Sequence, residues 1–185
     1  MRLSWLNHSR HVAQFALLGL LSAGCAQADT VPVVTWPANW DVQVLPAVLD
    51  AKGQPIPGVR QRAVKSDAGG NPVMIIELTQ SRVQPDHQVN LHDVLLEMRK
   101  SVQVNFMHGG YQSACTHFRE TTLSRLPALQ TTCQISLNGG HVMTQTLVAA
   151  VGKADAYAFA YAGSADQYEA SSSEIDSVRD SLNLE

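Results

Sequence analysis

Residues 156–162 read Ala-Tyr-Ala-Phe-Ala-Tyr-Ala, and this stretch decides the fold. Its strict alternation of rings and methyls has the period of two that is typical of a β-strand. One face presents Tyr157, Phe159 and Tyr161, which can cover a large apolar area. The other face presents four alanines and is smooth, so we expect a helix to approach it closely. A polar stretch and a helical pattern follow, which favours a compact α+β domain with a central antiparallel sheet.

Two amphipathic helices are predicted to pack on this sheet. Asn90 can cap a helix, and from Leu91 onward apolar residues recur at helical spacing until the Gly-Gly pair at 109–110. A second apolar stripe indicates a helix over residues 173–182. The sequence therefore predicts one helix in the middle of the chain and one at its end.

The other strands are expected from alternation and turn signals. Prolines and glycines in residues 45–58 indicate a loop, and Asp-Ala-Gly-Gly-Asn at 67–71 indicates a hairpin turn. Glu77 interrupts an apolar strand, and we expect it at a strand end that faces solvent; a buried carboxylate with a raised pKa is the alternative. The predicted strands cover residues 42–44, 59–65, 72–79, 114–122, 126–137, 141–151 and 156–162.

Residues 1–28 have the pattern of a secretory leader: a basic start, a short apolar run and then small residues. Cleavage after Ala-Gln-Ala at 26–28 would give a periplasmic or secreted protein with a single α+β domain over residues 29–185. Residues 21–25 also resemble a bacterial lipobox, so a lipoprotein anchored to the membrane through Cys25 is the alternative. The apolar run is too short for a membrane span.

The charge balance limits the partners. The full chain has a formal net charge of −3, and loss of the leader removes the basic residues Arg2 and Arg10. A mildly acidic chain of this kind argues against nucleic acid and against an anionic membrane surface as partners. The partner is therefore expected to be a protein or a small ligand.

Cys115 and Cys133 are the two cysteines that remain once Cys25 is removed or lipidated. An even pair in an oxidising compartment predicts a disulfide; two buried free thiols are the alternative. If the two cysteines lie opposite each other on neighbouring strands, Thr122 meets Leu126 and residues 123–125 form a three-residue hairpin loop.

Three short motifs resemble PsbP-like and DcrB-like domains. They are Pro-Ala-Asn-Trp at 37–40 before a strand, Leu-Pro-Ala at 126–128 before a long strand, and the closing helix at 175–182. With the order of elements, the resemblance covers roughly residues 35–184, and it extends to a family of small exported bacterial proteins. It implies an α/β/α sandwich, with helices on both faces of the sheet. It also implies mostly non-catalytic binding, assembly or accessory roles, including envelope- or virulence-related ones.

Candidate catalytic and metal-ligating residues are sparse. A metal site needs three or four converging ligands, and the best candidates are His87, His92 and Asp86, although their spacing favours solvated surface side chains. The serines lack the G-x-S-x-G pattern, and no phosphate-binding glycine motif is present. We therefore expect no cofactor and favour a non-enzymatic exported binding or accessory protein that acts through a groove beside the sheet or through a partner. The alternatives are a small periplasmic hydrolase whose site is assembled only in three dimensions, and metal handling.

Overall fold

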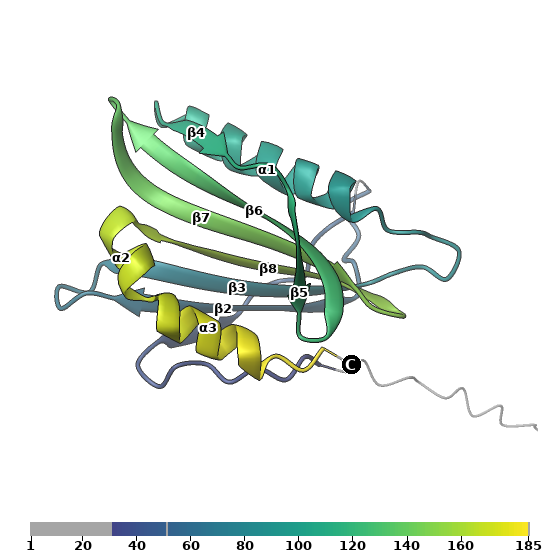
Figure 1. Cartoon of the computed structure of the whole chain (residues 1–185). Coiled ribbons are helices and arrows are strands. Elements are labelled where there is room, and N and C mark those ends of the chain that lie inside the picture. The colour runs from purple at the N-terminus through teal and green to yellow at the C-terminus, as the bar shows by residue number, and fades with distance from the viewer. Residues whose placement is uncertain (1–30, 51, 185) are drawn as a thin grey trace, which may run out of the picture.

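The computed structural model consists of a large antiparallel sheet with helices packed against it (Figure 1). It describes residues 31–50 and 52–184, so the predicted leader and Cys25 lie outside the described residues. The strands are β1 (Asp41–Val44), β2 (Gly58–Ser66), β3 (Pro72–Arg82), β4 (Gln112–Cys115), β5 (Arg119–Leu123), β6 (Leu126–Leu137), β7 (Gly140–Val151) and β8 (Asp155–Ser164). The helices are α1 (Leu91–Met107), α2 (Ala165–Ala170) and α3 (Ser172–Ser181). The spatial order of the strands is β1-β2-β3-β8-β7-β6-β4, and β5 pairs with β6 on the same edge as β4.

Strand β8 lies in the middle of the sheet, between β3 and β7, as its pattern predicts. Its aromatic side chains enter the larger of two core clusters, which we call the larger core. There Phe159 is fully buried and lies opposite Leu78 of β3 on one side and Val148 of β7 on the other. We call this side of the sheet the aromatic face and the opposite side the alanine face. Helix α3 packs on the aromatic face through Ile175 and Val178, so the closing helix is confirmed.

Helix α1 packs on the alanine face, but not centrally over the alanines. Its N-cap is confirmed, because Asn90 Oδ1 accepts a hydrogen bond from His92 N at 3.0 Å. The buried Leu95 and Val102 contact a second core cluster, and the helix lies mainly against β4, β6 and β7 (Figure 1). Residues 108–111 are the whole connection from α1 to β4, so the end of the helix is tethered to one edge of the sheet. The α+β class is confirmed, whereas the three-layer sandwich is realised only in part.

The disulfide between Cys115 and Cys133 is present and links β4 to β6, with the two residues directly opposite each other. The predicted loop after it is wrong. Leu123, rather than Thr122, pairs with Leu126, so the hairpin loop has two residues and Ser124 takes a positive φ of 55°. The register shifts by one across residues 116–118, where the expected single strand is divided into β4 and β5.

Candidate functional site

A cavity of about 560 Å³ lies on the alanine face, between the C-terminal end of α1 and strands β3, β7 and β8. We call it the alanine groove. Ile75, Ala160 and Ala162 line it from the sheet, while Asn105 and Phe106 line it from the helix. Its volume falls in the range of roughly 300–1,000 Å³ that is typical of small-molecule sites. The groove is therefore large enough for a specific ligand.

The groove exists because of the alanines and the tether of α1. Each of the four alanines of β8 is only half-buried, although β8 is central in the sheet. Methyl groups fill little space above the strand, and α1 is held toward β4, so neither closes the surface over β3 and β8.

At the end of β8, a Cβ on Gly163 would lie 2.4 Å from Met74 Sδ and 3.0 Å from Val73 O, so this position accommodates only glycine without a shift of its neighbours.

One rim of the groove is charged. Glu77 Oε1 accepts from Arg60 Nη2 at 2.6 Å, and Glu77 Oε2 accepts from Arg62 Nη2 at 3.0 Å and from Arg62 Nε at 3.3 Å. These side chains are partly exposed, with Arg62 at 36% and Glu77 at 23%. Glu77 is in the middle of β3 and not at a strand end, so that expectation is wrong. Two guanidinium groups against one carboxylate leave an excess of positive charge at this rim.

The lining can bind a ligand by shape, hydrogen bonds and charge. Asn105, Gln145 and Ser164 supply neutral polar groups, Arg62 supplies a cation, and most of the remaining lining is apolar. Within the described lining, Glu77 is the carboxylate, and it is held by two arginines. These groups are suited to recognition of a bound molecule.

The aromatic face is closed by contrast. Tyr168 of α2 stacks on Tyr161, with ring centroids 5.7 Å apart, and its hydroxyl lies 2.5 Å from Thr146 Oγ1. Burial raises the pKa of Tyr168 well above its ordinary value, so the phenol stays protonated. In the first turn of α3, Glu174 accepts hydrogen bonds from Lys65 Nζ and from Trp40 Nε1. On the alanine face, by contrast, α1 lies mainly against β4, β6 and β7, so the surface over β3 and β8 stays open.

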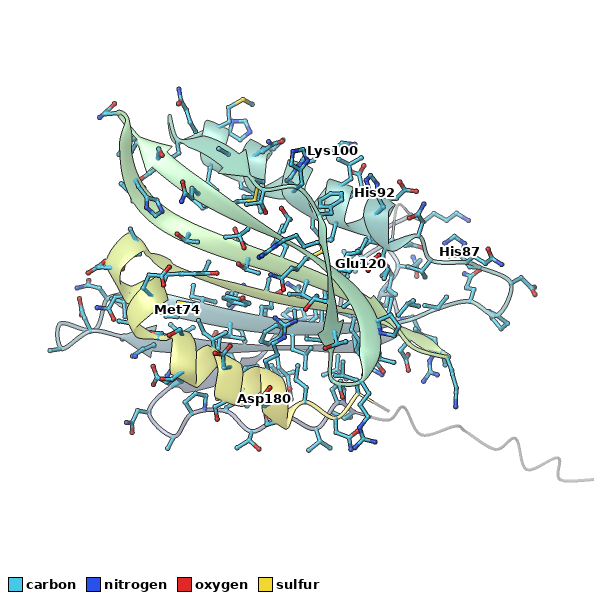
Figure 2. All side chains as sticks on the ribbon, in the orientation of Figure 1. Met74, His87, His92, Lys100, Glu120 and Asp180 are labelled. Atoms are coloured by element: carbon cyan, nitrogen blue, oxygen red, sulfur yellow. A yellow bond between two sulfur atoms is a disulfide. The ribbon has the colours of Figure 1, made fainter. Side chains whose placement is uncertain are left out.

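The predicted metal ligands do not come together. Figure 2 places His87 on the loop before α1 and His92 on α1 itself. The ring of His92 packs edge-on against Phe118, with centroids 4.7 Å apart, and its Nδ1 lies 3.9 Å from Asp93 Oδ1. Across residues 31–50 and 52–184, no three His, Cys, Asp or Glu side chains form a group that could hold a metal, so His87, His92 and Asp86 do not make one.

His87 instead lines a wider depression of about 930 Å³ at the opposite end of the sheet, with Arg82 and Lys153. Much of its lining comes from the loop at 83–89 and the turn at 152–154. The alanine groove is lined mainly by strands and a helix, which hold side chains more rigidly than loops do. We therefore take the smaller cavity as the candidate site.

The hydrolase alternative needs a histidine, a carboxylate and a nucleophile within hydrogen-bond reach. His141 Nε2 lies 2.9 Å from Thr144 Oγ1 and 3.0 Å from the carbonyl oxygen of Met143. His92, which lies on α1 and not on β7 with His141, contacts Asp93 and the ring of Phe118. These contacts do not favour a hydrolytic site.

Sequence reasoning missed the pairing of the two arginines with Glu77. Strand β2, which carries both arginines, lies next to the edge strand β1. The hairpin turn at 67–71 does not reveal this pairing, because a register shift between Lys65 and Ser66 moves the strands by one residue before Arg62 comes to lie opposite Glu77. In the described part of the chain, no helix has the length and apolarity needed to cross a bilayer.

Solved structures with this arrangement confirm the PsbP-like fold. The cyanobacterial PsbP protein CyanoP from Synechocystis has a TM-score of 0.55 and 12% sequence identity, over 90% of this chain and 100% of that one. LpqN of Mycobacterium tuberculosis, described as involved in cell envelope biogenesis, has a TM-score of 0.51 and 16% identity, over 85% and 86% of the two chains. At these identities the likeness shows the fold alone. No protein of curated function matches the sequence. One family model matches residues 31–184, nearly the whole described chain, and on this evidence the protein belongs to the family described as a domain of unknown function, DUF4946.

Proposed function

We propose that this protein is a non-enzymatic, exported binding or accessory protein that holds an elongated, largely apolar ligand in the alanine groove. The observation that carries the proposal is the half-buried, mostly apolar surface made by Ile75, Ala160 and Ala162 beside α1. Burial of apolar surface stabilises by about 25 cal/mol per Å², so a surface of this kind favours an apolar occupant. The bound ligand would complete the helical layer that α1 leaves open, and with it the three-layer sandwich.

Three observations support export and an accessory role. The leader pattern of residues 1–28 and the Cys115–Cys133 disulfide fit an oxidising compartment outside the cytoplasm. LpqN, which shares the fold, is described as involved in cell envelope biogenesis. A role at the bacterial envelope is therefore the role that we propose for this chain.

Ligand binding is tested by native mass spectrometry. The protein is recovered from the periplasm of an expressing bacterium, incubated with a detergent-free lipid and metabolite extract of the envelope, and compared with Ala162→Leu and Ala114→Leu. Ala162 lines the groove, whereas Ala114 is exposed on the edge strand β4 and serves as the matched control. Circular dichroism and the unfolding midpoint establish that both variants fold.

We expect the wild type and Ala114→Leu to carry the same additional mass, and we expect Ala162→Leu to lose it. The added isobutyl group would occupy the groove that the ligand needs. The proposal is wrong if no variant carries an additional mass, or if folded Ala162→Leu retains the ligand as well as the wild type does.

Export is tested separately by the intact mass of the protein in the periplasmic, membrane and cytoplasmic fractions of the same cells. Cleavage before Asp29 gives a chain of residues 29–185, and we expect this product. A chain that begins at a lipid-modified Cys25 would instead establish the anchored form, and an uncleaved chain in the cytoplasm would contradict export.

A further inference from the structure

The charged rim of the alanine groove has a guanidinium group with spare hydrogen-bonding capacity. Arg62 directs Nε and Nη2 at Glu77, and within the described residues its Nη1 has no hydrogen-bond acceptor. Arg60 uses Nη2 on Glu77 and Nη1 on the carbonyl oxygen of Pro46, at 3.3 Å. Arg62 is therefore the cation that remains available to a ligand, and its side chain is 36% exposed.

The electrostatics of the rim favour an anion. One of the two positive charges is balanced by Glu77, and the other is not balanced by a described ion pair at this rim. The chain as a whole is acidic, with a formal net charge of −3, so this rim differs in sign from the average surface. A single carboxylate would neutralise the excess charge and accept a charge-assisted hydrogen bond from the free Nη1.

The rest of the groove favours a hydrocarbon chain. From the level of Glu77 the lining continues along β3 through Ile75 to Val73, with Val142 and Met143 on the other side. The distance from Glu77 to Val73 is four residues, or about 13 Å at 3.3 Å per residue, which is the reach of an extended chain of about ten carbon atoms. The exposed Val142, 37% accessible, extends the apolar surface at this end.

We infer that the groove binds a monoanionic amphiphile, in which a carboxylate contacts Arg62 and an apolar chain of about ten carbons lies over Ala160 and Ala162. This inference rests on the proposed function and specifies its ligand class. It makes Arg62 the residue that determines head-group specificity, while the alanines and Ile75 determine affinity for the chain.

The test uses three probes that share a ten-carbon chain and differ in head group: decanoate, decan-1-ol and decyltrimethylammonium. Isothermal titration calorimetry at pH 7 and low ionic strength compares the wild-type protein with Arg62→Gln and Arg119→Gln. Glutamine keeps a polar side chain at position 62, and Glu77 retains its ion pair with Arg60. Arg119 is an exposed arginine on β5, so its substitution is the matched control for loss of one positive charge.

We expect the wild type to bind decanoate more tightly than decan-1-ol, and decyltrimethylammonium most weakly. Arg62→Gln should weaken decanoate binding by roughly fivefold to tenfold, as expected for a partly exposed charge-assisted contact, and should leave the affinity for decan-1-ol unchanged. Arg119→Gln should behave as the wild type does. Addition of salt should reduce the preference for decanoate, because the rim is open to solvent.

Equal binding of decanoate and decan-1-ol would overturn the inference about the head group and leave the apolar groove of the proposed function intact. A preference for decanoate that survives Arg62→Gln would also overturn it. Failure of all three probes to bind would overturn the ligand class, while the envelope-extract experiment would still decide independently whether the groove binds anything.

Discussion

Reduction of the Cys115–Cys133 disulfide should lower the free energy of unfolding by about 3 kcal/mol. The two cysteines are separated by 18 positions in the sequence. In the chain-entropy model, a cross-link that closes a loop of this length removes about 11 cal/mol/K from the unfolded state, or about 3 kcal/mol at 25 °C. For a domain of this size the loss corresponds to a decrease of about 6–12 °C in Tm. The bridge ties the short edge strand β4 to β6. Because β4 directly follows α1, reduction loosens the edge of the sheet to which the end of α1 is connected.

Urea unfolding of the oxidised and reduced wild type measures the effect, with tryptophan fluorescence as the signal. Trp40 is buried in the larger core, so its fluorescence changes when unfolding exposes this core to solvent. The double variant Cys115→Ala/Cys133→Ala is the control, because it should match the reduced wild type closely and should not respond to the reductant. A change below about 1 kcal/mol in the wild type would refute the argument, since the bridge would then constrain the unfolded chain far less than its loop length requires. A control that responds to the reductant would show that the effect does not arise from this bond.

Three further substitutions test the packing around β8 and α3. Phe159→Ala should lower the stability by about 3–5 kcal/mol in urea unfolding, because the ring is fully buried, and a loss below about 1 kcal/mol would contradict its place in the core. Gly163→Ala should cost about 1–3 kcal/mol in thermal unfolding, because its Cβ would meet Met74 Sδ, and an unchanged Tm would show that the close approach is absent. The hydrogen bond from Lys65 holds the pKa of Glu174 below its ordinary value, so this carboxylate stabilises the fold when it is ionised. Above pH ~4.3 the free energy of unfolding of the wild type should exceed that of Glu174→Gln by less than about 1 kcal/mol, and this difference should disappear as the pH falls through the lowered pKa of Glu174. A difference that stays constant from pH 7 to pH 2 would contradict the assignment.

The parts of the fold that depend on local pattern could be predicted from the sequence. The alternation at 156–162 places β8 in the sheet, and Asn90 with the apolar stripe after it defines α1. The opposition of Cys115 and Cys133 also follows from the pairing of neighbouring strands. The register beyond it does not, because the break at 116–118 shifts the pairing by one residue and no periodicity in the sequence marks that shift.

The candidate site could not be predicted in the same way. The alanines suggest a surface that a helix covers, and only the short connection from α1 to β4 shows that the helix stays to one side. The ion pair of Arg62 with Glu77 joins residues on two strands, so it depends on the β2–β3 register and not on the composition of either strand. The leader and the fate of Cys25 stay predictions, because they lie outside the described residues.

The accessibility of the alanine methyl groups tests the central claim most directly. In a protein labelled with ¹³C at its alanine methyls, a soluble paramagnetic agent accelerates the relaxation of methyls that solvent can reach. We predict clear acceleration for Ala160 and Ala162, which are half-buried, and almost none for Ala149 and Ala150, each 1% exposed on neighbouring β7. If Ala160 and Ala162 were as protected as Ala149 and Ala150, a helix would cover the alanine face and the groove would not exist.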